Sequence, residues 1–220
     1  DGEGCSKNLV CKYHGWAFNA DGKLLSARDF GADAPDHMDL TPIQVASWRG
    51  MVWVCLNPTV PPLPEWLGEF PAELQKPFNG METNGNPWNL SRMDRAAWTE
   101  GLEIKTMAEN PTAAVLYWVG CAASYDDRAK KIARATANLL KEAGVDFAIL
   151  GDEETCTGDP ARRAGNEYLY LMLAEQNVAT LKGYQDQGGI RTVLTTCPHC
   201  FNSLLNEYPQ LGAKLKVQHH

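Results

Sequence analysis

Residues 114–150 read AVLYWVGCAASYDDRAKKIARATANLLKEAGVDFAIL, and this stretch decides the fold. Its two ends, AVLYWVG and VDFAIL, are short apolar runs of the kind that form buried strands. The charged segment between them has helical spacing, with Ser124 as the expected N-cap and Gly144 as the expected C-cap glycine. A strand, a helix and a second strand in succession predict a parallel sheet with helical crossovers.

The same alternation continues towards the end of the chain. Residues 165–184 have the composition of a helix, and IRTVLTT at 190–196 that of a third strand. A short helix at 201–208 and a fourth strand at 213–218 are expected to follow. We therefore predict an α/β domain with a parallel sheet over residues 111–220.

The front of the chain has a different composition. Residues 1–57 contain short runs rich in tryptophan and β-branched residues, which favour strands, with hairpin turns at Ala20-Asp21-Gly22 and Arg49-Gly50. Residues 57–90 are rich in proline, asparagine and glycine, a composition typical of a linker or loop. The prediction is a two-part fold: a small all-β fragment at 1–75, a linker or junction at 76–110, and the α/β domain.

Composition excludes several classes of protein. The chain has 220 residues, 44% of them apolar, and a net charge of -7 without a cluster of Lys and Arg, so we expect no nucleic-acid binding. No run approaches the ~20 apolar residues of a membrane span. The seven cysteines are odd in number and unevenly spaced, unlike a secreted disulfide framework. We expect a cytoplasmic protein whose cysteines bind metal or perform redox chemistry.

Four cysteines follow the predicted parallel strands. Cys121 follows the first strand, Cys156 the second, and Cys197 and Cys200 the third. The carboxyl ends of parallel strands open onto one crevice, where α/β sheets bind ligands. Four thiolates are the ligand set of an ordinary iron–sulfur cluster. Two alternatives remain open: Cys121 and Cys156 could be buried core residues, and Cys197-Pro-His-Cys200 could be a thiol–disulfide exchange motif.

These residues also carry a family resemblance. The stretch from Gly120 through "ILGDEETCTGDPARRAGNEYL" to "TTCPHCFNSLLNEYP" resembles the cysteine-rich domain of heterodisulfide-reductase-like iron–sulfur oxidoreductases. The resemblance implies that Cys121, Cys156, Cys197 and Cys200 bind a cluster and that redox proteins or subunits are the partners. Thr157 stands where the family has a second cysteine, which favours a four-cysteine [4Fe–4S] cluster over a five-cysteine one.

A second resemblance covers the front of the chain. The motif CKYHGWAF at 11–18, with the NADGKL hairpin and SWRGMVWVCLNP, resembles the Rieske domain of ring-hydroxylating oxygenases. It implies that Cys11 and His14 are metal ligands, each binding one iron of a [2Fe–2S] cluster. The family's other Cys–His pair and its mononuclear-iron domain are not found in this sequence. We therefore expect the Rieske cluster only if the missing ligands are supplied, and we interpret Cys5 as a loop residue.

The sequence thus predicts an iron–sulfur electron-transfer protein, a component of an oxidoreductase, assembled from two partial family segments. The alternatives are a thiol–disulfide oxidoreductase acting through Cys197 and Cys200, and a truncated or chimeric protein that is cofactor-free or binds zinc and has no activity. Cys55 is interpreted as a packing residue, and His199 as a neighbour that tunes the site rather than a ligand. Arg162 and Arg163 are either a solvated pair or a source of positive charge near the cluster.

Overall fold

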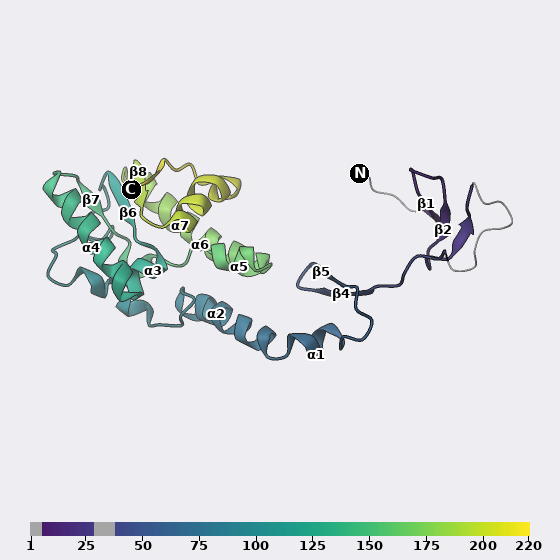
Figure 1. Ribbon diagram of the computed structural model, residues 1–220. Helices are drawn as coiled ribbons and strands as arrows, with labels where there is room; N and C mark the ends of the chain where they lie inside the picture. The colour runs from purple at the N-terminus through teal and green to yellow at the C-terminus, as the bar shows by residue number, and fades with distance from the viewer. Residues whose placement is uncertain (1–5, 29–37) are drawn as a thin grey trace. The chain divides into compact units, whose positions relative to one another are not determined.

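A computed structural model describes residues 6–28 and 38–220 and divides the chain into two compact units. Unit 1 comprises Asp1–Trp66 and unit 2 comprises Leu67–His220. Figure 1 shows antiparallel strands in unit 1 and a helix-covered parallel sheet in unit 2, which confirms the two-part organisation at this level. The interpretation of Cys5 as a loop residue concerns a position outside the described residues.

Unit 1 contains two small antiparallel sheets. The first has three strands, β1 (Asn8–Val10), β2 (Ala17–Asn19) and β3 (Leu24–Ser26), and the second pairs β4 (Gln44–Trp48) with β5 (Met51–Cys55). Both predicted hairpins are present. Arg49 and Gly50 both have positive φ, 50° and 75°, as a two-residue hairpin turn requires.

The segment predicted as a linker is helical instead. Helix α1 spans Leu63–Leu67, α2 spans Phe70–Asn84, and the 3₁₀ helix η2 spans Arg92–Thr99. Some of the prolines and glycines that suggested a linker delimit α2, because Pro71 lies in its first turn and Gly85 ends it with a φ of 67°, whereas Pro77 and Gly80 lie inside the helix. Helix α2 buries Phe78 and Met81 in the core of unit 2, so burial outweighs the local breakers.

The sheet of unit 2 is wholly parallel, as predicted. Its strands lie in the order β7 (Phe147–Ala148), β6 (Val115–Trp118), β8 (Thr192–Thr195) and β9 (Val217–His219). The central strand β6 pairs on both sides, so its backbone groups are satisfied without solvent. All four strands present their carboxyl ends at one edge.

Helices cover both faces of this sheet (Figure 1). Leu116 and Trp118 of β6 pack in one cluster with α2 and α6 (Glu167–Asp186), while Tyr117 packs on the opposite face with η2 and α4 (Asp127–Glu142). The remaining elements are α3 (Gly120–Tyr125), η3 (Gly151–Glu153), α5 (Asp159–Arg163), α7 (Pro198–Asn202), the π-helical turn η4 (Ser203–Glu207) and η5 (Tyr208–Leu211). Among the helices of the described residues, none is both long and apolar enough to cross a membrane.

The predicted N-cap at Ser124 is wrong, because the expected single helix is two. Ser124 lies inside α3, where its hydroxyl donates to the Gly120 carbonyl oxygen. Asp126 breaks the helix and caps α4, accepting hydrogen bonds from the amides of Arg128 and Ala129. Gly144 has a φ of 65° directly after α4, as expected for a C-cap glycine.

Candidate metal centre

The four cysteines of unit 2 lie where the parallel strands end. Cys121 is in the first turn of α3, immediately after β6, and Cys156 is in the loop that follows β7 and η3. Cys197 follows β8 as the N-cap of α7, and Cys200 lies within α7. Cys156 and Cys200 are buried, Cys121 and Cys197 are half-buried, and all four are free thiols.

Buried polar contacts fix the loop that carries Cys156. Its amide donates to the Gly85 carbonyl oxygen at 2.7 Å, at the end of α2. Its carbonyl oxygen accepts from Nδ2 of Asn177 at 3.0 Å, and the same nitrogen is 3.1 Å from the Tyr208 hydroxyl. Since Asn177 and Tyr208 are fully buried, the position of this thiol is set by the core.

The thiols interact in two pairs, Cys121 with Cys156 and Cys197 with Cys200, and the pKa values of the two members of each pair shift in opposite directions. Gly120 lies next to both pairs. It directly precedes Cys121 in the chain, and a Cβ at this position would lie 3.1 Å from Cys200 Sγ and 3.6 Å from the Cβ of Cys197. A φ of 79° at Gly120 lets the backbone pass this close to the second pair. The structure therefore brings the four predicted ligands into one neighbourhood.

Each pair holds one thiol of low pKa and one of high pKa. The hydrogen bond from Cys156 lowers the pKa of Cys121 to about 7 against the opposing effect of burial, and the charge of Arg95 adds to it. The hydrogen bond from Cys200 lowers the pKa of Cys197 to about 6, and the backbone amides of Cys200 and His199 contribute. Cys156 and Cys200 have raised pKa values, because each donates to its partner and is buried. Near neutral pH each pair thus offers a thiolate, the form that binds metal.

A buried ion pair adjoins Cys121. Arg95 on η2 and Glu154 after η3 are each 2% exposed in their side chains, and Arg95 Nη2 lies 2.8 Å from Glu154 Oε1. The same nitrogen is 3.5 Å from Cys121 Sγ. Glu154 also accepts from the backbone amides of Val119 and Gly120, at 3.0 and 2.8 Å. Burial lowers the pKa of Arg95, but the negative charges of Cys121 and Glu154 outweigh it, so the guanidinium stays charged.

The donor set consists of four free thiols, which is the ligand set of an iron–sulfur cluster. Among the described residues, no three or more His, Cys, Asp or Glu side chains form a group that could hold one metal ion. The thiolates of a [4Fe–4S] cluster each bind a different iron, so they stand farther apart than the ligands of one ion. In the same part of the chain, Arg95 Nε and Trp118 Nε1 are buried without hydrogen-bond partners. Donors of this kind suit an anionic group with many acceptor sulfurs.

His199 and Thr157 make polar contacts inside unit 2, and their interpretation as non-ligands stays a prediction. His199 Nδ1 lies 2.9 Å from Asp159 Oδ2, and its side chain is largely exposed. Asp159 also pairs with Arg163, and both Arg163 and Arg162 pair with Glu207, so the two arginines join one ionic network beside α7. Thr157 is buried, and its carbonyl oxygen accepts from the hydroxyl of Tyr208.

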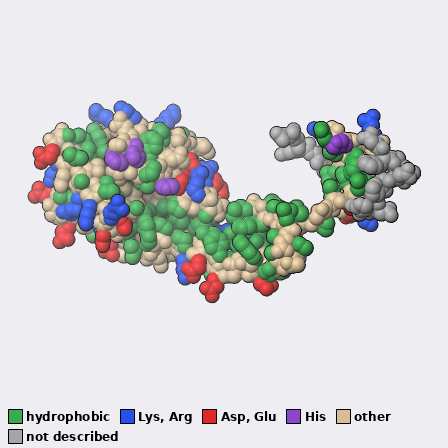
Figure 2. Space-filling model, in the orientation of Figure 1, with side chains coloured by type: hydrophobic (Ala, Val, Ile, Leu, Met, Phe, Trp, Pro, Cys, Tyr) green, Lys and Arg blue, Asp and Glu red, His purple; other side chains and the backbone are tan. Residues whose placement is uncertain are grey.

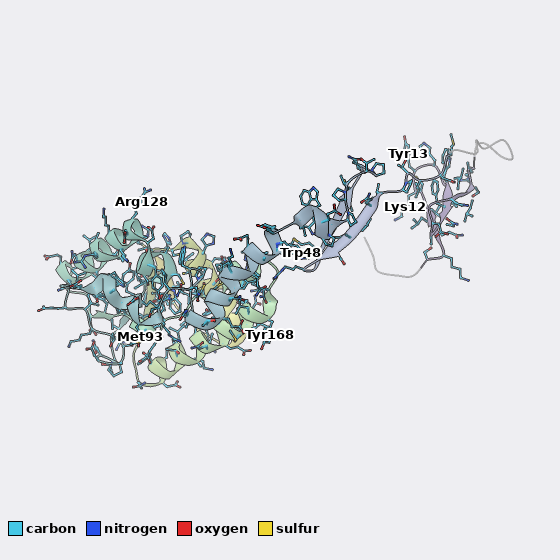
Figure 3. The ribbon with its side chains drawn as sticks, turned by 90° about the horizontal axis from the view of Figure 1, so that it is seen from below. Lys12, Tyr13, Trp48, Met93, Arg128 and Tyr168 are labelled. Atoms are coloured by element: carbon cyan, nitrogen blue, oxygen red, sulfur yellow. The ribbon has the colours of Figure 1, made fainter. Side chains whose placement is uncertain are left out.

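The Cys11 and His14 pair lies on a turn in unit 1. The Gly15 amide donates to the Cys11 carbonyl oxygen at 2.7 Å, and the amides of His14 and Tyr13 lower the pKa of the exposed Cys11 thiol. Figure 3 shows Tyr13 and Lys12 on this turn, and Tyr13 packs edge-on against His14 with ring centroids 4.1 Å apart. No third ligand joins them among the described residues of the chain.

The comparisons with known proteins bear on unit 2. Residues 115–205 match the cysteine-rich domain family. This domain begins at β6 and ends in η4, so it includes all four cysteines but not Arg95. The result supports the resemblance of the C-terminal part to iron–sulfur oxidoreductases.

Several curated relatives share part of their length with the chain. EtfAB:quinone oxidoreductase of Syntrophomonas wolfei is 41% identical over 160 residues, which are 70% of this chain and 22% of that protein. A heterodisulfide reductase subunit of Methanosarcina barkeri is 32% identical over 133 residues, 59% of this chain and 30% of that protein. The chain thus spans less than a third of the length of these relatives. The comparison with solved structures finds no match.

A different relative bears weakly on the front of the chain. The large oxygenase component of the naphthalene 1,2-dioxygenase system of Pseudomonas putida is 32% identical over 116 residues, 49% of this chain and 24% of that protein. The name is that of an aromatic-ring dioxygenase, the class that the CKYHGWAF motif suggested. The assignment of Cys11 and His14 as ligands stays a prediction.

Proposed function

We propose that unit 2 is an electron-transfer module that binds one [4Fe–4S] cluster through Cys121, Cys156, Cys197 and Cys200. The observation that carries the proposal is the meeting of two thiol pairs across Gly120 at the carboxyl end of one parallel sheet. Support comes from the match to the cysteine-rich domain and from relatives named as oxidoreductases, one of them a "Probable iron-sulfur-binding oxidoreductase" of Bacillus subtilis.

When bound, the cluster supplies one-electron transfer. The chain's own residues set the conditions for that transfer. Cys156 and Cys200 hold the inner side of the site away from water, while the half-buried Cys121 and Cys197 form its outer side. Binding requires all four thiols as thiolates, so the two of raised pKa, Cys156 and Cys200, release their protons on loading.

The module would act as a component of a larger oxidoreductase rather than alone. Some relatives are named as subunits of reductases, including the heterodisulfide reductase of Methanosarcina barkeri and a fumarate reductase of Methanothermobacter marburgensis. We therefore propose that its partners are redox proteins or subunits that deliver and accept single electrons at the outer side of the site.

Anaerobic reconstitution of the full chain with iron and sulfide tests the proposal. We expect about four irons and four sulfides per chain, with an EPR signal on reduction. Replacing Cys121 or Cys197 by serine should abolish most of the iron, whereas Cys55→Ser, in β5 of unit 1, should leave it unchanged. Fewer than about two irons per chain, or zinc in place of iron in protein purified without oxygen, would contradict the cluster.

A second candidate function rests on the acidity of Cys197. A thiol of pKa about 6, preceding a buried partner three residues later at the start of a helix, is typical of thiol–disulfide oxidoreductases. The nearness of Cys200 to Gly120 and the Cys121 pair favours the cluster instead. Reduction of insulin disulfides by the iron-free chain would support exchange, and the absence of turnover would remove it.

For unit 1, we propose that Cys11 and His14 are half of a Rieske [2Fe–2S] site. Support comes from the amides that surround the Cys11 thiol and from the similarity to the dioxygenase component. Because a Rieske cluster needs two Cys and two His, this chain alone should give no Rieske EPR signal. A signal that disappears in Cys11→Ser would contradict that expectation and show that the other ligands are supplied.

A further inference from the structure

Arg95 has an environment that stability alone does not explain. It lies on η2, outside the matched cysteine-rich domain, and its side chain is 2% exposed, whereas Met93 on the same helix is exposed at the surface (Figure 3). Burying a paired charge is a weak source of stability, because apolar residues of similar volume do as well or better. The position of the guanidinium against a predicted cluster ligand therefore calls for another reason.

The guanidinium of Arg95 makes hydrogen bonds to three acceptors. Its Nη2 lies 2.8 Å from Glu154 Oε1 and 3.5 Å from Cys121 Sγ, while Nη1 donates to the Gly85 carbonyl oxygen at 3.4 Å. Glu154 receives two further hydrogen bonds from the amides of Val119 and Gly120. Because those two amides also interact with the Glu154 carboxylate, the carboxylate does not fully neutralise the guanidinium. The positive charge of Arg95 therefore still attracts the thiolate of Cys121.

Resting on the [4Fe–4S] site proposed above, we propose that Arg95 is a positioning residue that raises the reduction potential of the cluster. Reduction adds one electron and no proton, so the cluster and its ligand sulfurs become more negative. A positive charge and an N–H donor against Cys121 Sγ stabilise this reduced form more than the oxidised one. Glu154 has the opposite effect, since its negative charge disfavours the added electron.

The test compares reconstituted full-length chains. We would load wild type, Arg95→Gln, Arg95→Lys, Glu154→Gln and the control Arg134→Gln without oxygen, and count iron in each. Arg134 is a matched control because it also binds η2, through the carbonyl oxygens of Trp98 and Glu100, and has no thiol among its hydrogen-bond partners. The midpoint potential of each chain is then titrated with dithionite and mediators, with EPR as the readout.

We expect the variants to shift in opposite directions. Arg95→Gln should reduce the equilibrium constant for one-electron reduction about tenfold, which is a fall of about 59 mV. Glu154→Gln should raise the potential, Arg95→Lys should restore most of the wild-type value, and Arg134→Gln should match wild type. A role in folding alone would not move the potential in both directions.

Unchanged potential in loaded Arg95→Gln overturns the inference but leaves the proposed function intact. If Arg95→Gln binds no iron, the potential of Glu154→Gln becomes the deciding measurement. A raised potential in that variant supports the inference, and an unchanged or lower one overturns it. Should both fail to load, Arg95→Lys is the deciding variant. A small fall below the wild-type potential, as expected where the charge stays and the guanidinium N–H donors are lost, supports the inference, and a potential equal to or above wild type overturns it. Failure of the wild-type chain to bind iron on reconstitution would contradict both the proposed function and this inference.

Discussion

The strands of the two units are built from similar residues but reach different degrees of burial. Strand β6, VLYW, is buried over its last three residues, whereas β5, MVWVC, has no fully buried residue. Figure 2 shows hydrophobic side chains gathered over the β4–β5 hairpin and α1, where a groove of about 520 Å³ lies between the hairpin and the proline-rich stretch Val60–Pro64. Strand propensity thus suffices to form a hairpin, but a core requires a second layer packed on the sheet.

The two units also differ in how they hold their candidate ligands. Cys156 in unit 2 is fixed by a carbonyl from α2 and an amide from α6, both far away in sequence. Cys11 in unit 1 is surrounded only by amides from its own turn, three residues away at most. A local turn can present one pair of ligands, whereas a complete site is built from elements that the core brings together.

The largest expected effect is on the core of unit 2. Trp118→Ala removes a fully buried side chain from β6 and should lower the free energy of unfolding by about 3–5 kcal/mol. Trp66→Ala removes a side chain that is 59% exposed in unit 1 and should cost under about 1 kcal/mol. Urea unfolding followed by far-UV circular dichroism measures both. Equal losses would contradict the contrast in burial.

A smaller effect is expected at Gly120 than at Trp118, and Gly101 serves as its control. Both glycines have positive φ, but only Gly120 lies against other side chains. Gly120 and Gly101 have φ values of 79° and 75°, so alanine should cost about 1–2 kcal/mol of strain at each. Only at Gly120 would the new Cβ meet a thiol, at 3.1 Å from Cys200 Sγ, whereas nothing lies within 4 Å at Gly101. Gly120→Ala should therefore lose iron on reconstitution and Gly101→Ala should keep it. Retention of full iron by both would show that the thiol pairs need not be this close.

A still smaller effect is expected at the start of α4. Asp126→Ala removes two capping hydrogen bonds, of 3.1 and 2.8 Å, and should destabilise unit 2 by about 1 kcal/mol. Its neighbour Asp127 makes an exposed pair with Lys130, so Asp127→Ala should change stability by less than about 0.5 kcal/mol. Thermal unfolding of both variants checks the difference, and the reverse order would contradict the role of Asp126 as the cap of α4.

The last prediction leaves stability unchanged and concerns thiol reactivity in the iron-free chain. Because a lowered pKa gives thiolate at lower pH, alkylation of Cys197 by iodoacetamide should be half-maximal near pH 6 and that of Cys121 near pH 7. Cys156 and Cys200, with raised pKa values, should react only at much higher pH. Peptide mass spectrometry over a pH series separates the four, and a common midpoint would contradict the paired arrangement.

The sequence predicted the strands and the placement of the four cysteines, because both depend on local periodicity. Apolar runs separated by amphipathic segments define β6, β7 and β8, and each cysteine follows one of these runs within a few residues. The short helix predicted at 201–208 begins three residues earlier, at Pro198, and continues from α7 into η4. These features need no knowledge of distant partners.

Arg95 and Glu154 were missed because their relationship is not local. They are 59 residues apart, and Arg95 lies in the stretch 76–110 that was predicted as a linker or junction. One available signal was Ser91 three residues before Asp94, since Ser91 caps η2 by accepting from the Met93 amide. That signal predicts a helix start but not which side chain enters the core.

The carbonyl oxygen of Gly85 has a consequence for how the protein matures. It ends α2 and accepts hydrogen bonds from the Cys156 amide and from Arg95. The segment that follows unit 1 is therefore held against the loop that carries Cys156. Before this segment docks, the loop of Cys156 lacks its hydrogen bond to the Gly85 carbonyl oxygen. Iron added before docking would meet thiols that are not yet in their final positions. A protease cut between residues 85 and 95 should therefore release the proposed cluster before it unfolds the sheet.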